Sequence, residues 1–427
     1  MDASVTFITC FFDLQKRENS QRRNKDYYFE KAEFLFKQNQ NIIFFIDPEL
    51  QIDVWKRRKA HNLLDKTYIV PIRCEDLDYV KAHLDATQKN FIQHPVHNFQ
   101  PGKETPLYIL LTWSKFKLLN SGIELNPFNS THFAWIDFGL SHIAKTTDTI
   151  LHDCIQHFDD KIKILSMKHL ARCELVDMNR YYDWIMGKMA AGFITGLKDN
   201  MLKLCQAFDV KVSETIKLGR AILEEQILPL IYTQNPQLFK LYYGDYDHIL
   251  LNYNKIQGNI DLILTNVVWS RERREFEMAF QICEALLDSS FQCPPVKMLT
   301  IFHEAFINGW NSDKSKCLMV LSKLSVLCDK DPEFRKVYLL NYPKLKNFNL
   351  SFDLVSIKIG IVDTSSAELD LSKLLDVPDL NKLLLECQVI IFTGKTEQWN
   401  NFPPCNPCYK RLTEISDFPG LKFISQN

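Results

Sequence analysis

The sequence predicts an α/β protein whose first part is a sheet flanked by helices. Over residues 1–140, apolar runs rich in β-branched and aromatic residues alternate with charged, helix-favouring stretches. Such alternation is typical of βαβ units, in which a helix connects two parallel strands. A second observation agrees with it, since three of the apolar runs are followed by an aspartate. In open α/β sheets the ligand crevice lies beyond the carboxyl ends of the strands, where these acids would stand.

Six elements are expected in this part, in the order strand, helix, strand, strand, helix, strand. They lie at residues 5–12, 26–38, 41–47, 66–72, 107–125 and 132–139. Asp13, Asp47 and Asp137 end the first, second and fourth strands, so one site could contain all three acids. Each acid taken alone is also a common turn or cap residue.

Residues 150–285 continue with short strands and long helices. The stretch "AAGFITGLKDNMLKLCQAF" at 190–208 carries Gly192 and Gly196 immediately before a helix. The whole chain holds only thirteen glycines, and sparse glycines mark places where the backbone comes close to another group. The backbone here could therefore approach a bound ligand.

A helix expected at 217–232 places Glu224, Glu225 and Gln226 in an otherwise apolar sequence. Because three consecutive residues cover nearly a full helical turn, at least one of them must face inward. The next segment, "YYGDYDHILLNY" at 242–253, gathers Asp245, Asp247 and His248.

Three domains are predicted. Residues 1–288 form the main α/β domain, residues 289–350 read as a connector of two or three amphipathic helices, and residues 351–427 form a small α/β appendage. The appendage is expected to contain strands at 352–362, 387–394 and 421–425.

The charge balance and the lengths of the apolar runs exclude several classes. The 427 residues include 51 Lys and Arg against 52 Asp and Glu, a net charge of -1. No global basic field is available to attract nucleic acid or an anionic membrane, and neither partner is predicted. The longest apolar runs fall short of the roughly 20 residues that cross a bilayer. The N-terminal segment reads as a first strand rather than a signal peptide, so a cytoplasmic protein is expected.

The twelve cysteines are spread along the chain, mostly in apolar or helical contexts. This distribution favours reduced, buried thiols over a disulfide framework. Cys405 and Cys408 alone have the spacing of a zinc-binding pair, and the second pair that a zinc site needs is missing.

The stretch "FAWIDFG" at 133–139 contains the Asp-Phe-Gly of protein kinases, but the companions of that motif are absent. Residues 1–40 contain no glycine, and no His-Arg-Asp precedes Asp137. A kinase needs both a glycine-rich loop and that catalytic loop. The kinase interpretation is therefore rejected.

Six segments of the chain together resemble one family. They are "FITCFFDLQKR", "IIFFIDPEL", "LYILLTWSKFKLLNSGIELNPFNSTHFAWIDFG", "AAGFITGLKDNM", "EEQIL" and "LYYGDYDHILLNY". Their order and approximate spacing resemble those of the WlaTC/HtrL-type glycosyltransferase family, over about residues 4–285. The resemblance implies a GT-A-like fold, in which an α/β sheet binds a nucleotide-sugar and an Asp-x-Asp element usually holds a divalent cation.

The resemblance places Asp137, Phe138 and Gly139 at the Asp-x-Asp element, where the second carboxylate is missing. A hard cation held by carboxylates would neutralise the departing diphosphate, so Mn²⁺ or Mg²⁺ is expected. Asp245 and His248 are the candidates for the remaining ligands. In the alternative, Asp245 stabilises a turn and His248 packs on a helix.

Nucleotide contacts are expected from the first strand and the turn after it. The resemblance carries Thr9, Phe12 and Asp13 to this role, although Asp13 could instead cap the following helix. Arg57, in the basic run "KRRK", is a candidate clamp for the diphosphate, because guanidinium matches phosphate oxygens with two parallel donors. Lys115 is a further candidate. Solvated surface positions are the alternative for both cations.

The second half of the domain is expected to bind the acceptor. The backbone at Gly192 and Gly196 could approach a sugar, and Glu224 or Glu225 could deprotonate an acceptor hydroxyl. The predicted function is transfer of a sugar from a nucleotide donor, expected to be a UDP-sugar, to a hydroxyl acceptor by a metal-dependent, hexosyltransferase-like enzyme. A catalytically inactive nucleotide- or sugar-binding protein is the alternative, and residues 290–427 could dock a partner.

Overall fold

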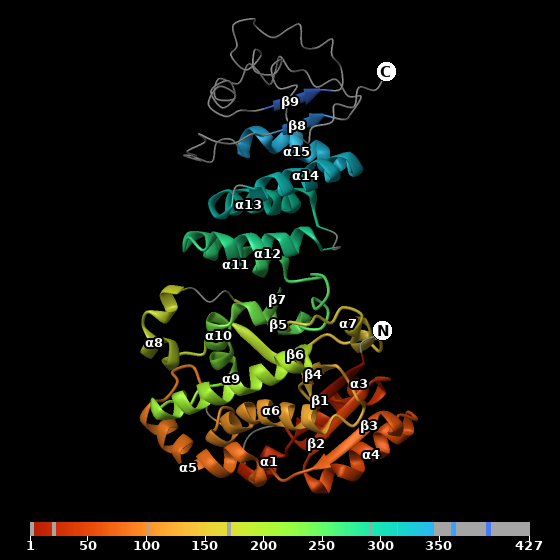
Figure 1. The fold of residues 1–427 in the computed structure, drawn as a ribbon, viewed down its shortest axis with the longest axis vertical. Coiled ribbons are helices and arrows are strands. Elements are labelled where there is room, and N and C mark those ends of the chain that lie inside the picture. Colours follow the sequence, from red (N-terminus) through yellow and green to blue (C-terminus); the bar gives the residue numbers. More distant parts are fainter. Residues whose placement is uncertain are drawn as a thin grey trace, which may run out of the picture. The chain divides into compact units, whose positions relative to one another are not determined.

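The computed structural model describes residues 4–18, 23–100, 102–168, 172–289, 293–313, 315–345, 360–363 and 390–393. The chain divides into two compact units, Met1–Gln292 and Cys293–Asn427. Figure 1 labels most of the helices and strands of both units.

The first unit is built on a seven-stranded mixed sheet. In chain order its strands are β1 (Val5–Phe11), β2 (Asn41–Ile46), β3 (Thr67–Pro71), β4 (His132–Ile136), β5 (Ile162–Ser166), β6 (Met189–Leu197) and β7 (Phe239–Tyr243). They are arranged in the order β3-β2-β1-β4-β6-β5-β7. All pairs are parallel except the two that β6 makes, with β4 and with β5. The predicted α/β class, a sheet flanked by helices, is confirmed.

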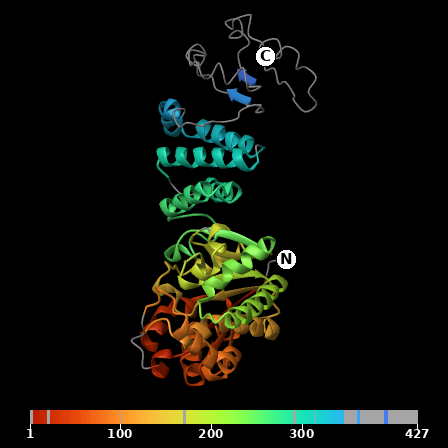
Figure 2. The ribbon, with the colours of Figure 1, turned by 90° about the vertical axis from the view of Figure 1, so that its left-hand side faces the viewer.

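Helices cover both faces of this sheet (Figures 1 and 2). One face packs against α5 (Asp78–Gln93), α6 (Pro106–Leu125), α9 (Lys198–Lys217) and α10 (Glu224–Gln234). The other packs against α2 (Lys25–Lys31), α3 (Glu33–Lys37), α4 (Gln51–Ala60) and α7 (Ile150–Ile155). Short helices α1 (Leu14–Glu18) and α8 (Met178–Asp183) lie in connections, and α11 (Ile260–Glu272) pairs with α12 (Phe276–Leu287).

The central strands β1, β2, β4 and β6 are largely apolar because both of their faces are buried. Side chains alternate between the two cores along each strand. On β4, for example, Phe133 and Trp135 enter the core under α6, whereas Ala134 and Ile136 enter the opposite one. All four are at most 1% exposed. Each large apolar side chain buried in this way contributes about 1.5–3 kcal/mol.

The structure corrects several expected boundaries in the first unit. The helix expected at 26–38 is two helices separated at Ala32, and the helix expected at 217–232 begins at Glu224. Gly192 and Gly196 lie within strand β6, and helix α9 begins directly after that strand, as expected. Among the described residues, no helix is both long and apolar enough to cross a membrane.

The second unit contains α13 (Pro295–Ser312), α14 (Ser315–Lys330) and α15 (Pro332–Leu345), which pack on one another, and a parallel pair β8 (Gly360–Asp363) and β9 (Ile390–Thr393). The three helices match the amphipathic segments expected there. The strand expected at 421–425 and the cysteines Cys405 and Cys408 lie outside the described residues. The unit boundary falls at 292/293, and the predicted division at 350 stays a prediction.

Candidate functional site

Three predicted acids lie at the carboxyl edge of the sheet, as the strand order requires. Asp13 follows β1, Asp47 follows β2 and Asp137 follows β4. Because β6 runs the other way, its beginning lies at the same edge, and the backbone N–H of Asp137 donates to the carbonyl of Gly192 at 2.9 Å. The edge is therefore built by residues from separate parts of the chain.

Asp137 lies in a cluster of charged side chains centred on Lys115. The Lys115 ammonium, on α6, is 2.9 Å from Asp137 Oδ1 and 3.1 Å from Oδ2, and it donates to Glu224 Oε1 at 2.7 Å. The Lys115 side chain is 14% exposed, that of Glu224 5% and that of Asp137 36%. Asp137 is thus the most exposed of these three side chains.

Side-chain periodicity explains why these groups meet. Asp137 stands two residues after Trp135, so both side chains point to the sheet face that α6 covers. The indole Nε1–H of Trp135 donates to Asp137 Oδ1 at 2.8 Å. Asp137 therefore has its oxygens fixed by an indole and an ammonium before any ligand binds.

Glu225 follows Glu224 in the first turn of α10 and is partly buried. Burial, together with the charges of Glu224 and Asp137, raises the pKa of Glu225 to about 8, although Lys115 and the backbone N–H of Ala191 act in the opposite direction. An acid with this pKa can hold or accept a proton near neutral pH. The sequence-based expectation that one acid of this turn faces inward is met by Glu224.

The two glycines of β6 lie in different surroundings. A Cβ atom on Gly192 would lie 3.0 Å from Leu140 Cδ1 and 3.6 Å from Asp137 Oδ2, so this glycine adjoins the cluster. A Cβ atom on Gly196 would instead meet Met201 and the carbonyl of Lys161. Gly196 pairs with Phe133, toward the other end of β4.

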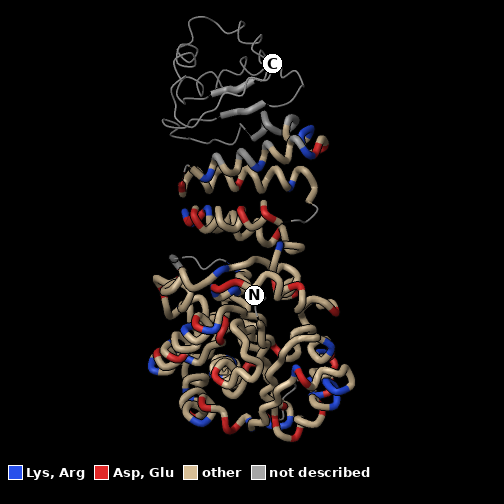
Figure 3. Tube along the Cα trace, turned by 45° about the vertical axis from the view of Figure 1, so that its right-hand side comes forward, with Lys and Arg blue, Asp and Glu red and all other residues tan. Residues whose placement is uncertain are grey.

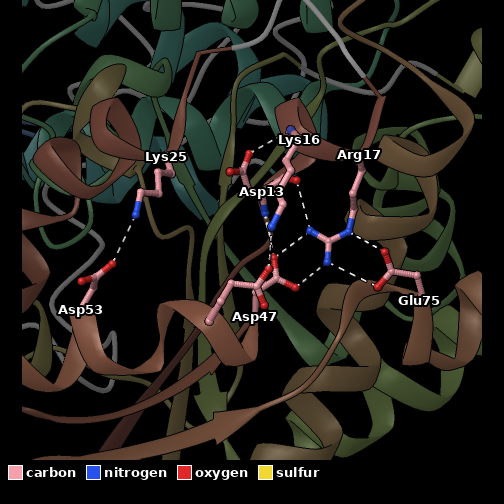
Figure 4. Close-up of polar contacts among 8 residues, drawn as sticks. Asp13, Lys16, Arg17, Lys25, Asp47, Asp53 and Glu75 are labelled. Carbon is pink, nitrogen blue, oxygen red and sulfur yellow. Dashed lines mark hydrogen bonds and ion pairs between the residues drawn. The ribbon is translucent and has the colours of Figure 1, made fainter.

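A second charged group, centred on Arg17, fixes the ends of the first two strands (Figure 4). Arg17 Nη1 and Nη2 donate to the two oxygens of Asp47 at 2.8 and 2.7 Å, and Nε donates to Glu75 at 2.7 Å. Nη1 also donates to the carbonyl of Asp13 at 3.1 Å, and Nη2 to Glu75 Oε2 at 3.4 Å. These contacts match all five N–H groups of the guanidinium, which leaves none for a phosphate.

Sequence reasoning missed Arg17 and gave Asp47 no partner. Asp47 is fully buried and also accepts from the backbone N–H of Asp13 at 3.0 Å. An arginine four residues after Asp13, in the short segment that follows the first strand, is the signal that could have pointed to the pair.

The three predicted nucleotide-binding residues of the first strand and its following turn differ in their exposure to solvent. Thr9 is fully buried in β1, and its hydroxyl has no hydrogen-bond partner in the structure. Phe12 is 6% exposed and belongs to the core. Asp13 is partly exposed, and its carboxylate accepts from the backbone N–H of Lys16 at 3.3 Å, which is the capping arrangement considered above. Asp13 alone of the three presents a side chain at the edge.

The basic run of α4 is divided between two structural roles. Arg57 donates to Glu33 at 2.7 Å and lies over the rings of Phe29 and Phe36, so its contacts are not with the Lys115 cluster. Arg58 is fully buried and donates to Thr67 and to five backbone carbonyls, those of Leu35, Phe36, Gln38, Gln40 and Lys66.

Asp245 and His248 lie in the loop after β7. Asp245 is exposed and accepts from the backbone N–H of Tyr246 at 2.7 Å. His248 lies 2.8 Å from Asp247 through Nδ1 and 3.2 Å from the ammonium of Lys145 through Nε2. Over the described part of the chain, no three His, Cys, Asp or Glu side chains are placed to hold a metal ion together. The structure therefore does not assemble Asp137, Asp245 and His248 into one set of ligands.

Basic and acidic residues are interspersed over the described parts of the chain (Figure 3). This agrees with the net charge of -1. The electrostatics of the candidate site are therefore local to the cluster of Lys115, Asp137, Glu224 and Glu225.

A family model described as "Bacterial protein of unknown function (HtrL_YibB)" matches residues 3–253. The match covers the whole seven-stranded sheet and part of the segment between β7 and α11. This chain belongs to the HtrL_YibB family. The predicted relationship to HtrL-type proteins is confirmed, and protein HtrL of Escherichia coli strain K12 is 24% identical over 260 residues, which is 57% of this chain and 89% of HtrL.

Two solved structures are similar to this member of the family at low level. Mouse xyloside xylosyltransferase 1 in its apo form is 12% identical, with a TM-score of 0.31 and coverage of 56% of this chain and 85% of that one. The 4-diphosphocytidyl-2C-methyl-D-erythritol synthase of Anaerococcus prevotii is 11% identical, with a TM-score of 0.31 and coverage of 63% and 97%. At this TM-score neither similarity bears on the function of the family.

Proposed function

We propose that this chain is a glycosyltransferase that moves a sugar from a nucleotide-sugar donor to a hydroxyl acceptor, with the Lys115 cluster as its catalytic centre. The observation that carries the proposal is the placement of Glu225, with a pKa of about 8, beside two further acids at the carboxyl edge of the sheet. The sequence resemblance to GT-A-like glycosyltransferases supports the same reaction. A UDP-sugar is the donor class that the resemblance favours.

The chemistry needs a base for the acceptor and groups that orient a sugar. In the proposed step, the Glu225 carboxylate accepts the proton of the acceptor hydroxyl while that oxygen bonds to the anomeric carbon of the donor. The bond from this carbon to the diphosphate breaks, and its electron pair leaves with the diphosphate. A base whose pKa lies near the working pH is suited to such a proton transfer. Asp137, partly exposed and held by Trp135 and Lys115, would accept hydrogen bonds from sugar hydroxyls.

A divalent metal near Asp137 stays a prediction, and the residues present do not fit it well. Asp245 and His248 have the contacts described above, and Asp137 shares its oxygens with Lys115. We therefore route no step through a metal ion.

The test is a release assay for UDP with a panel of UDP-hexoses, paired with calorimetric measurement of donor binding. Glu225→Gln should lower turnover by about 100-fold or more while donor affinity stays the same, because it removes the base and keeps the shape of the side chain. Glu30→Gln is the matched control, since the Glu30 side chain is 71% exposed and pairs with its neighbour Lys31.

Two results would contradict the proposal. Wild-type turnover in Glu225→Gln would remove Glu225 from the mechanism. Donor binding by the wild type without any transfer or hydrolysis would favour the non-catalytic binding protein instead.

A further inference from the structure

The centre of the candidate site is occupied by a side-chain cation. Lys115 comes from α6, Asp137 from the end of β4 and Glu224 from the start of α10. The ammonium is 2.7–3.1 Å from one oxygen of Glu224 and both oxygens of Asp137. Carboxylates from two separate elements thus point at a single position, and that position holds Lys115 Nζ.

Two converging carboxylates are also how proteins hold Mg²⁺ or Mn²⁺, which prefer oxygen ligands. We propose that the Lys115 ammonium is the resident cation of this site, in the place that a divalent ion would take, so that the transfer reaction needs no added metal. This inference rests on the proposed function for its catalytic meaning. The occupancy of the position by Lys115 does not depend on that function.

Charge and burial keep the ammonium in place. Burial alone would lower the pKa of Lys115, but the charges of Asp137 and Glu224 outweigh burial and raise this pKa well above its usual value. Lys115 therefore stays protonated across the physiological range. A divalent ion bound by the same two carboxylates would lie beside a permanent positive charge, which would repel it.

Three other described acids that follow strands at this edge, Asp13, Asp47 and Asp245, have partners of their own. Asp47 is fully buried, and both of its oxygens accept from Arg17. Asp13 caps α1, and Asp245 caps the turn after β7. The missing second acid of the Asp-x-Asp element, at Gly139, agrees with a site that has its cation built in.

The first experiment measures binding of Mn²⁺ alone to the wild-type full chain by electron paramagnetic resonance at neutral pH. We expect no stoichiometric binding at millimolar Mn²⁺. Lys115→Ala should gain about one bound Mn²⁺ per chain, because it leaves Asp137 and Glu224 facing an open position beside Glu225. The double variant Lys115→Ala with Asp137→Asn should lose that gain.

Lys117→Ala is the matched control. Lys117 lies on the same helix and pairs with one carboxylate, Asp209, at 2.5 Å. Its removal should leave Mn²⁺ binding at the wild-type level. If Lys115→Ala does not fold, the wild-type titration still tests the inference, because one bound Mn²⁺ that the Asp137→Asn variant loses would contradict it.

Two outcomes of the binding measurements would overturn the inference. One is binding of one Mn²⁺ per wild-type chain that is absent in the Asp137→Asn variant. The other is a folded Lys115→Ala chain that gains none. Neither measurement needs a donor or turnover, so the Mn²⁺ result can be interpreted even if the proposed function is wrong. Conversely, transfer that stops with EDTA and returns with Mn²⁺ would refute the inference while supporting the transferase.

Discussion

Two adjacent glutamates at the start of α10 have different electrostatic surroundings. Glu224 is buried and has the ammonium of Lys115 as its partner. Glu225 is partly buried, and the negative charges of Glu224 and Asp137 contribute to the rise of its pKa to about 8. Neighbouring carboxyl groups in unlike environments are how one site can keep one acid charged and use the other for proton transfer.

This difference predicts how stability depends on pH. The folded-state pKa of Glu225 is raised from 4.5 to about 8, so between these values the folded chain holds a proton that the unfolded chain has lost. The associated stability is fully present below about pH 4.5 and is lost as the pH rises through about 8. Glu225→Gln removes the ionisable group and with it this loss of stability at high pH. Its free energy of unfolding relative to the wild type should rise by at least about 1 kcal/mol from pH 5 to pH 9.

Urea unfolding of both chains at the two pH values measures this change, with Glu30→Gln as the control. A difference between Glu225→Gln and wild type that does not vary with pH would mean that Glu225 ionises in the folded chain much as it does in the unfolded one.

At the residue scale the sequence indicates acids better than their partners. Asp137 and Glu225 could be named because an acid after a strand, or within an apolar helix, breaks the local pattern. Arg17 was missed because its partners Asp47 and Glu75 lie 30 and 58 residues away. Arg58 was passed over for Arg57 because burial of an arginine among backbone carbonyls leaves no sequence signal.

At the scale of elements, the strands with β-branched and aromatic runs were predictable and β6 was not. Residues 189–193 of β6 read "MAAGF", and alanines favour a helix in isolation. The alanines nevertheless lie in a strand, because β6 is paired between β4 and β5, and Ala190 and Ala191 are fully buried there. Tertiary packing overrides the local propensity at this strand.

The two glycines of β6 should therefore respond differently to substitution. Gly192→Val would place branched carbons against Leu140 and close to Asp137 Oδ2, and we expect turnover to fall by about 100-fold as the carboxylate is displaced. The added methyl group of Gly196→Ala would crowd the Lys161 carbonyl and Met201, which are not part of the Lys115 cluster. It should lower the melting temperature while turnover at permissive temperature stays near wild type.

Thermal unfolding and the UDP-release assay, applied to both variants, separate these effects. Equal loss of turnover in the two would show that β6 acts on the site only through general stability.

For the molecule as a whole, the sequence predicted a main α/β unit followed by helices, and the extent of that unit follows from contacts beyond the family match. The match ends at residue 253, but the compact unit runs to Gln292. Asn266 of α11 is buried and donates to the carbonyl of Met167, just after β5, at 2.8 Å. The backbone N–H of Ile256 donates to Ser289 Oγ at 3.1 Å. The helices α11 and α12 therefore complete this unit.

These contacts predict the outcome of truncation. A chain ending at Gln292 should unfold in one cooperative transition and keep the donor affinity of the full chain, because the sheet and its covering helices are complete. A chain ending at Tyr253 should be less stable by several kcal/mol, since it loses the partner of the Met167 carbonyl and exposes apolar surface that α11 and α12 cover. Urea unfolding of both chains measures the difference. Equal stability of the two truncated chains would place the limit of the folding unit at the end of the family match. Loss of donor binding in the chain ending at Gln292 would assign part of the site to residues 293–427.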